Sequence, residues 1–325
     1  MNQNSNYGEA LSHLLEETRL SVSEVGERLE EALDPAYWEK LNPSLSINGA
    51  SPGYDLDAIA INSQETEIVD RFVREGYFQL EPTLSDSAIA QLKDSIEVVK
   101  RAGWPPVFAF VYDQPWLATR TPSLMKFLSA ILGAGYRQSG HLWSHYVNPT
   151  KDATGWPPHV DNLHCPDRVT VWVALNDATL DNGCLYLIPK DRIPRRIVET
   201  LYGHQNSVPI VDLKVMLQSA LALPARCGTV LGWQHDVIHW GSFHRGEQEH
   251  PRISISQEFI GASVESKNDE LVFPVHSSLP TFAERLHAIA AEILVYQKVE
   301  TLLIRYVELA RRLTAATAAA TLKRM

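Results

Sequence analysis

Short β-rich segments separated by turn residues fill the middle of the chain, and this pattern most constrains the fold. From Gly140 onward, segments of five to eight residues rich in Val, Ile, Trp and Tyr alternate with turn residues. They are Leu142–Val147, Val169–Leu175, Cys184–Ile188, Thr229–Trp233 and Ile253–Ile260. No alternation of strands and helices with glycine-rich phosphate loops occurs, which argues against a doubly wound nucleotide-binding fold. The pattern predicts an antiparallel double sheet or jelly roll.

Helical patterns flank this β-rich region on both sides. Apolar spacing and capping residues predict helices near Leu11–Leu15 and over Val22–Leu33, Gln64–Glu75, Ser85–Arg101 and Pro122–Leu132, with a short strand at Tyr77–Leu80. Residues Asn42 to Tyr54 are predicted to form a loop. After the β-rich region, an apolar stripe recurs in steps of mostly three and four residues, at Leu286, Ile289, Ile293, Tyr296, Leu303, Val307 and Ala310. The stripe predicts a C-terminal helix that packs on the domain or, as the alternative, forms a homodimer.

Composition narrows the class of protein. The 325 residues are 45% hydrophobic and 21% charged, which is typical of a globular protein, and the net charge is -10. An acidic surface repels phosphate backbones, so we expect no nucleic-acid partner. No run of about 18 apolar residues and no signal-peptide pattern is visible, so we expect no membrane association and a cytoplasmic location. The three cysteines Cys165, Cys184 and Cys227 are too few for a disulfide framework and are expected to be reduced thiols.

A candidate metal site opens with the sequence Pro157-Pro158-His159-Val160-Asp161. Residues i and i+2 of a strand project to one face, so His159 and Asp161 can offer a nitrogen and an oxygen to one ion. Alone the pair is a weak signal, because about half of random chains of this length and composition would contain the spacing. A non-haem Fe(II) oxygenase needs two histidines and one carboxylate on one octahedral face. The third ligand must then come from a distant strand.

The segment Gly228 to Ser242 supplies the third candidate ligand, His239. His235, His244 and His250 compete with His239 for this role. Thirteen residues after His239 stands Arg252, at the start of another predicted strand. A guanidinium binds a carboxylate through two parallel hydrogen bonds, as a dicarboxylate cosubstrate would require at its far end. Ser254 shares the face of Arg252 and can add a hydrogen bond.

Three stretches of the chain resemble the phytanoyl-CoA dioxygenase-like branch of the Fe(II)/2-oxoglutarate-dependent oxygenases. The first is Val69-Asp-Arg-Phe-Val-Arg-Glu-Gly-Tyr with Leu84-Ser-Asp and the helix after it. The second and most specific is Val169-Thr-Val-Trp-Val-Ala-Leu-Asn-Asp-Ala-Thr-Leu-Asp-Asn-Gly-Cys-Leu-Tyr-Leu-Ile-Pro, which is similar to a family passage that follows H-x-D. The third is His239-Trp-Gly-Ser with Arg252, which resembles the family's distal H-G-S and its arginine. The resemblance spans residues 64–259.

The resemblance implies a fold that is mainly β with flanking α, in which the core is a double-stranded β-helix, also called a jelly roll or cupin-like fold. The predicted organisation is an N-terminal helical extension at 1–60, the oxygenase domain with its supporting helices at 61–275, and a C-terminal helical extension at 276–325. The resemblance also implies that His159, Asp161 and His239 hold Fe(II), that Arg252 binds 2-oxoglutarate, and that O2 is a cosubstrate.

The resemblance also places residues around these cofactors. Trp172 and Trp143 would line the cosubstrate pocket, and Ser242 or Gly241 would lie beside it. The family's serine comes two residues after the distal histidine, whereas here Trp240 intervenes and Ser242 comes three after, so Ser254 is an alternative to Ser242. Candidate substrate contacts near the H-x-D pair are His145, Asn162, His164 and Trp240.

The predicted function is hydroxylation of an unactivated C–H bond of a small metabolite or natural-product intermediate, with release of succinate and CO2. Asp161 supports oxidation of a C–H bond over halogenation, because related halogenases carry Gly or Ala at this position and leave room for chloride. Two alternatives remain open. One is a cupin-like metalloenzyme that does not use 2-oxoglutarate, and the other is a non-catalytic binding protein on the same fold. Arg252 argues against the first, and the intact triad with Arg252 argues against the second.

Overall fold

The computed structural model describes residues 19–47, 65–151, 153–203, 209–246, 250–265 and 270–321. The chain divides into two compact units, residues 1–43 with 280–325 and residues 44–279. The helix predicted near Leu11–Leu15 lies outside the described residues, as does the loop predicted at 42–54 beyond residue 47. The division predicted at residues 60 and 275 stays a prediction.

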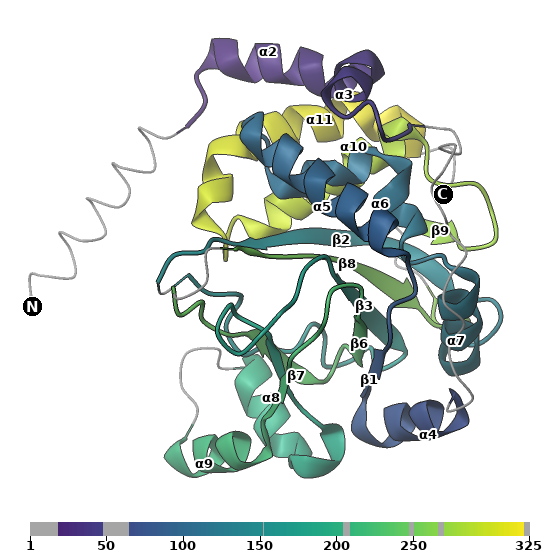
Figure 1. The fold of residues 1–325 in the computed structure, drawn as a ribbon, viewed down its shortest axis with the longest axis vertical. Coiled ribbons are helices and arrows are strands. Elements are labelled where there is room, and N and C mark those ends of the chain that lie inside the picture. Colours follow the sequence, from purple (N-terminus) through teal and green to yellow (C-terminus); the bar gives the residue numbers. More distant parts are fainter. Residues whose placement is uncertain are drawn as a thin grey trace, which may run out of the picture. The chain divides into compact units, whose positions relative to one another are not determined.

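Two antiparallel sheets form the core of the larger unit, which confirms the predicted jelly-roll fold (Figure 1). The six-stranded sheet has the order β1-β6-β3-β8-β2-β9, and the three-stranded sheet has the order β5-β4-β7. The strands are β1 Tyr77–Leu80, β2 Arg137–Val147, β3 Arg168–Ala174, β4 Leu185–Ile188, β5 Leu221–Leu223, β6 Val230–Gln234, β7 Ile238–Gly241, β8 Arg252–Ile260 and β9 Val272–Pro274. The β8 strand is buried along its whole length, and β3 and β2 pair with its two edges.

Helices support the six-stranded sheet, and Figure 1 shows α5 and α6 on its side away from β7. They are α4 Glu65–Glu75, α5 Asp86–Arg101, η1 Pro106–Val111, α6 Asp113–Leu117 and α7 Pro122–Leu132. The predicted helices at 64–75, 85–101 and 122–132 are therefore confirmed. Ser85 accepts a hydrogen bond from the Ala88 amide as the N-cap of α5. Three helices that were not predicted, η2 Lys190–Arg192, α8 Arg195–Gly203 and α9 Ile210–Ser219, lie between β4 and β5.

The smaller unit consists of helices in its described part. They are α2 Val22–Leu33, α3 Pro35–Leu41, α10 Phe282–Tyr296, η3 Thr301–Tyr306 and α11 Val307–Thr321. Capping boxes begin α2 at Ser21 and α10 at Thr281. The apolar stripe of α10 is buried within this unit, because α10 packs against α11. Packing within the chain thus covers the stripe, and a homodimer through this helix stays a prediction.

An irregular segment at 153–159 runs antiparallel along the edge of β7. The Gly155 amide donates to the Ser242 carbonyl (3.4 Å) and the Gly241 amide donates to the Trp156 carbonyl (3.1 Å). His159 and His239 lie directly opposite each other and exchange both backbone hydrogen bonds, at 3.1 and 3.0 Å. This pairing brings together two histidines that are 80 residues apart in the sequence.

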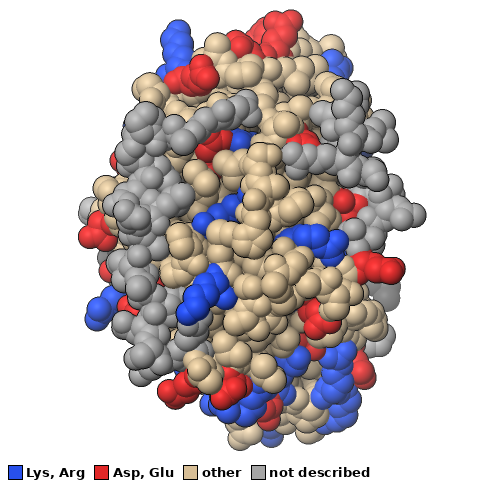
Figure 2. All heavy atoms as spheres, turned by 90° about the vertical axis from the view of Figure 1, so that its right-hand side faces the viewer, with Lys and Arg blue, Asp and Glu red and all other residues tan. Residues whose placement is uncertain are grey.

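Surface and helix properties bear on the expected partners. Among the described helices, none combines the length and the apolar character needed to cross a membrane. On the face drawn in Figure 2, Lys and Arg side chains are interspersed with Asp and Glu. The absence of a nucleic-acid or membrane partner and the cytoplasmic location stay predictions. The three cysteines are free thiols.

Candidate metal centre and cosubstrate pocket

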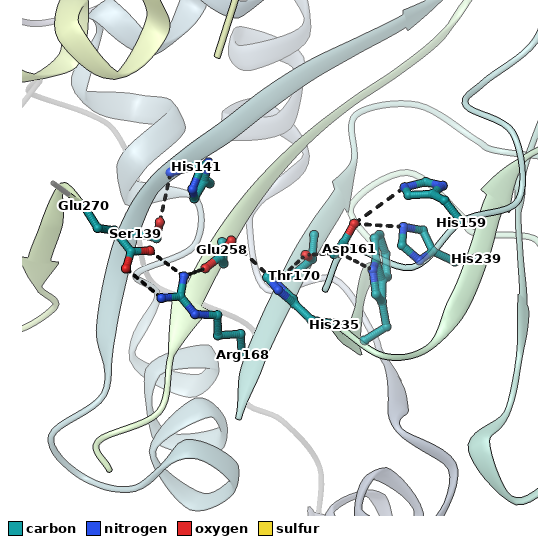
Figure 3. Close-up of polar contacts among 11 residues, drawn as sticks. Ser139, His141, His159, Asp161, Arg168, Thr170, His235, His239, Glu258 and Glu270 are labelled. Carbon is teal, nitrogen blue, oxygen red and sulfur yellow. Dashed lines mark hydrogen bonds and ion pairs between the residues drawn. The ribbon is translucent and has the colours of Figure 1, made fainter. Parts of the chain in front are cut away.

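Three side chains from the paired segments meet at one point. The ligand atoms of His159, Asp161 and His239 lie within 4.8 Å of one another. The Nε2 atoms of His159 and His239 are each 3.6 Å from Oδ1 of Asp161, as Figure 3 shows. In the described part of the chain, these three residues are the one such group of His, Cys, Asp and Glu side chains. The structure thus brings together the three residues that were predicted from the sequence as metal ligands.

Backbone carbonyls orient both imidazoles. Nδ1 of His159 lies 2.7 Å from the Pro157 carbonyl oxygen, and Nδ1 of His239 lies 3.0 Å from that of Val237. A carbonyl only accepts, so each Nδ1 carries the proton and donates it. Each Nε2 therefore keeps a free lone pair, and Nε2 of His159 is buried without a hydrogen-bond partner. This tautomer is the one that a metal-binding histidine requires.

At His239 and Asp161, the site also favours the protonation states that bind a metal. Burial lowers the pKa of His239 to about 4, despite the opposing effect of Asp161, so this imidazole is neutral near pH 7. Burial acts to raise the pKa of Asp161, but His239 and the contact with His159 hold it well below its usual range. For His159, burial acts to lower the pKa, but the contact with Asp161 outweighs it and raises the pKa, so a metal must compete with a proton at this imidazole. The centre therefore presents a neutral His239 and an ionised carboxylate. Two histidines and one carboxylate on one side of an ion are the donor set of non-haem Fe(II) oxygenases, and the residues present fit that ion.

The competing histidines have other partners. His235 lies 3.4 Å from the hydroxyl of Thr170 and 3.5 Å from Glu258, on the far side of Thr170 from the triad (Figure 3). His244 is 3.1 Å from the His250 carbonyl through Nε2, and its Nδ1 accepts the Gly246 amide. These contacts leave His239 as the third member of the group.

Arg252 is a buried cation without a carboxylate partner among the described residues. It is 1% exposed, and its guanidinium lies 5.9 Å from the ring centre of Trp172. Nη1 donates to the Ser254 hydroxyl at 3.4 Å, whereas Nε is buried without a hydrogen-bond partner. Burial lowers the pKa of Arg252 to about 10, and no Asp or Glu offsets this effect. A guanidinium in this state lacks the anion that would stabilise it.

Gly155 and Gly183 lie beside the same guanidinium, and neighbouring backbone leaves no room for a Cβ at either position. A Cβ added to Gly155 would lie 3.2 Å from Nη2 of Arg252 and 2.7 Å from Cα of Gly241. At Gly183, whose φ is +95°, a Cβ would lie 2.8 Å from the Ser242 carbonyl oxygen and 3.8 Å from Nε of Arg252. The backbone of Gly241 and Ser242 thus excludes side chains at these two positions beside Arg252.

Three other residues predicted to line the cosubstrate or substrate pocket are Trp172, Trp143 and His145. Trp172 is buried, and its indole Nε1 has no hydrogen-bond partner. Trp143 is buried with its ring centre 6.1 Å from that of Trp156. His145 lies 3.2 Å from the Ser256 hydroxyl and 5.4 Å from Trp156 between ring centres. Burial, Arg252 and the two triad histidines hold the pKa of His145 well below its usual range, so this neutral imidazole lies close to both the triad and Arg252.

Four predicted residues lie less directly on the site. Ser242 and Trp240 alternate with His239 and Gly241 along β7, so their side chains face the other way. Trp240 stacks on Tyr186 with ring centres 5.4 Å apart, which places it outside the metal side of the strand. The Asn162 side chain accepts the His164 amide in a turn. The exposed His164 ring packs against Tyr202.

Two residues that the sequence analysis did not select also contact the triad. The Thr170 hydroxyl lies 2.8 Å from Oδ2 of Asp161, and the Trp233 indole donates to the same oxygen at 3.1 Å. Strand parity could have found one of them, because Thr170 is two residues before Trp172 and shares its face. Trp233 depends on the pairing of β6 with β3, which no local pattern reveals.

The chain belongs to the phytanoyl-CoA dioxygenase (PhyH) family, whose model matches residues 72–254. This match covers more than half of the 325 residues and confirms the family predicted from the sequence. The family's cofactors are Fe(II) and 2-oxoglutarate, and the described residues fit both: the triad offers the metal ligands, and Arg252 offers a cation for a carboxylate.

Curated relatives show the same family name. The chain is 30% identical over 122 residues to phytanoyl-CoA dioxygenase from Arabidopsis thaliana, which covers 35% of this chain and 42% of that protein. It is 33% identical over 93 residues to phytanoyl-CoA dioxygenase 1 from Oryza sativa subsp. japonica, which covers 25% and 31%. The chain therefore spans less than half the length of the curated relatives it matches.

Solved structures with a similar fold are more distant. The non-haem α-ketoglutarate-dependent epimerase SnoN from nogalamycin biosynthesis is 16% identical, with 66% of this chain and 88% of that chain covered and a TM-score of 0.49. EctD from S. alaskensis is 16% identical, with 69% and 86% covered and a TM-score of 0.47.

Proposed function

We propose that this protein is an Fe(II)/2-oxoglutarate-dependent oxygenase. The observation that carries the proposal is the pair formed by the triad and Arg252. A protein that only bound a metal would have no need of a buried guanidinium whose counter-ion is missing among the described residues. A dicarboxylate cosubstrate explains both features, because one end can chelate the metal while the other end neutralises Arg252.

The chain's own residues have distinct tasks in this proposal. His159, Asp161 and His239 hold the metal and leave the rest of its coordination sphere open. Arg252 binds the far carboxylate of 2-oxoglutarate, helped by the Ser254 hydroxyl. The ring centre of Trp156 lies 5.9 Å from that of His159, so that aromatic surface excludes water beside the metal. When bound, Fe(II) with 2-oxoglutarate supplies the activation of O2 that oxidises the substrate.

We further propose that the reaction is hydroxylation of a C–H bond of a small metabolite or natural-product intermediate. In balanced form, R–H, 2-oxoglutarate and O2 give R–OH, succinate and CO2, with one oxygen atom entering each organic product. Asp161 supports this outcome, since a carboxylate fills the position that a halide ligand would need. Incorporation of ¹⁸O from ¹⁸O2 into the product distinguishes hydroxylation from desaturation or cyclisation, which add no oxygen to the substrate.

The first experiment is an anaerobic visible spectrum of the metal-free protein titrated with Fe(II) and then with 2-oxoglutarate. A metal-to-ligand charge-transfer band that requires both additions is expected for wild type. Arg252→Ala should weaken the affinity for 2-oxoglutarate, because the buried cation is removed. Arg245→Ala is the matched control, since Arg245 pairs with Asp181 at the surface. Absence of the band in wild type would overturn the proposal and favour a cupin-like metalloenzyme or a binding protein.

A further inference from the structure

Two hydrogen-bond donors from neighbouring strands converge on one oxygen of Asp161. Thr170 on β3 and Trp233 on β6 are directly opposite in the antiparallel register, so their side chains project side by side on one face. The Thr170 hydroxyl and the Trp233 indole lie 2.8 and 3.1 Å from Oδ2 of Asp161. Oδ1 of the same carboxylate faces Nε2 of both histidines at 3.6 Å. The two oxygens of Asp161 thus have separate partners.

The direction of the Thr170 hydrogen bond follows from its neighbours. An ionised carboxylate only accepts, so Thr170 must donate its single hydroxyl proton to Asp161. The oxygen of Thr170 can then accept a hydrogen bond from Nε2 of His235, 3.4 Å away, if the hydrogen is shared with the neighbouring carboxylate. Glu258 lies 3.5 Å from the same Nε2. Figure 3 shows this chain running from the triad through Thr170 and His235 toward Glu258.

A buried ion cluster fixes the outer end of the chain. Arg168, on β3, forms ion pairs with Glu258 on β8 and with Glu270, and all three side chains are at most 10% exposed. The second Arg168 nitrogen, Nη2, donates to Glu270 at 2.6 Å. Because Arg168 holds Glu258 from one side, Glu258 is positioned to face His235. His235 therefore faces both Thr170 and Glu258 through the same nitrogen, Nε2.

We propose that Thr170 and Trp233 are positioning residues that restrict Asp161 to binding the metal through Oδ1 alone. The inference rests on the proposed function, since it treats Asp161 as a ligand. With Oδ2 engaged by two donors, binding through both oxygens would require breaking both hydrogen bonds. Binding through one oxygen leaves three coordination positions, enough for a chelating cosubstrate and O2.

The ring of Trp233 gives this residue a second contact with the centre. Its centre lies 4.5 Å from that of His239, at an interplanar angle of 39°. Trp233 is 4% exposed and lies between β1 and β3 in the sheet. Trp233, on the six-stranded sheet, therefore contacts both Asp161 and His239, which lies on the three-stranded sheet.

The test measures metal binding and a spectrum, not turnover. The variants are Thr170→Val, which removes the hydroxyl at nearly constant shape, Thr170→Ser, which keeps it, and Trp233→Phe, which removes the indole donor. Thr83→Val is the matched control, because the Thr83 hydroxyl is buried without a partner in the segment between β1 and α5. Anaerobic titration gives the Fe(II) dissociation constant, and later addition of 2-oxoglutarate gives the charge-transfer band. Far-ultraviolet circular dichroism and thermal melting show whether each variant is folded.

We expect Thr170→Val and Trp233→Phe each to weaken Fe(II) binding by about tenfold or more. The band should move to longer wavelength, because Asp161 without these donors places more negative charge on the metal. Thr170→Ser and Thr83→Val should retain the wild-type affinity and band. Folded Thr170→Val and Trp233→Phe variants with wild-type affinity and spectrum would overturn the inference. If Thr170→Val does not fold, Trp233→Phe decides alone. A wild-type protein that binds no Fe(II) would instead overturn the proposed function.

Discussion

The substitution Gly241→Ala tests how closely the backbones of Gly241 and Gly155 approach each other beside Arg252. A Cβ at position 241 would lie 2.8 Å from Cα of Gly155 and 3.4 Å from Nη2 of Arg252. The first contact is with backbone, which cannot rotate away as a long side chain can. The backbone of Gly241 is in a strand, so the expected penalty is steric and does not come from an unfavourable φ.

The size of the effect follows from these distances. Carbon atoms in favourable contact are about 3.5–4.0 Å apart, so the segment at Gly155 must retreat by about 0.7 Å or more. The retreat strains two backbone hydrogen bonds, Gly155 to Ser242 and Gly241 to Trp156. Overpacking of this kind typically costs about 1–3 kcal/mol of unfolding free energy. We expect a loss in that range.

Binding of 2-oxoglutarate should weaken as well, because the displaced segment at Gly155 lies beside the guanidinium that is proposed to bind its far carboxylate. We expect the dissociation constant to rise by about tenfold, equivalent to about 1.4 kcal/mol. The effect on Fe(II) alone should be smaller, since the nearest atoms to the new methyl group belong to Gly155 and Arg252. Urea unfolding and titration of the charge-transfer band measure the two quantities.

Gly26→Ala is the matched control for this experiment. Gly26 lies inside α2, and a Cβ there would meet nothing within 4 Å. In a helix interior, alanine is favoured over glycine by roughly 0.5–1 kcal/mol. The same chemical change should therefore stabilise the protein at position 26 and destabilise it at 241. A Gly241→Ala protein with wild-type stability and wild-type affinity for 2-oxoglutarate would refute the close approach described here.

Three further predictions test the charges and a helix cap. Arg252→Met should leave the cofactor-free protein as stable as wild type or more stable, by up to about 3 kcal/mol, while removing the thermal shift caused by 2-oxoglutarate; a destabilised variant would contradict this. Arg168→Met should cost about 3–5 kcal/mol in urea unfolding because it leaves buried carboxylates unpaired, whereas Arg245→Ala at the surface should cost less than about 1 kcal/mol. Thr281→Ala removes the capping box of α10 and should cost about 1 kcal/mol, and equal stability would show that the cap contributes nothing.

Elements with local signals were predictable from the sequence. The helix at Pro122–Leu132 has the predicted bounds, since proline at its start and Gly133 after its end mark both limits. The strand β3 begins and ends only one residue before its predicted bounds, because a run of β-branched and aromatic residues defines it. The family resemblance supplied the metal ligands, and the geometry of β7 explains how they meet.

Elements fixed by distant contacts were not predictable. The strand β2 begins at Arg137, five residues before the predicted start, because polar residues there are satisfied by tertiary partners. Gln138, for instance, accepts hydrogen bonds from Arg120, and its amide donates to Thr119. The helix α9 was not predicted because most of its apolar residues face outward, with Ile210 73% exposed, so it lacks an amphipathic pattern.

The departure of the distal motif from its family has a physical explanation in the fold. Position 241, two residues after His239, faces Arg252, so a serine there would bring a hydroxyl to the anchor. Here the backbone of Gly155 lies against position 241 so closely that no Cβ fits. The hydroxyl beside Arg252 comes instead from Ser254, on the same face of β8 and 3.4 Å from Nη1. The approach of segment 153–159 to β7 thus favours glycine at 241, and it leaves Ser254 as the hydroxyl that contacts Arg252.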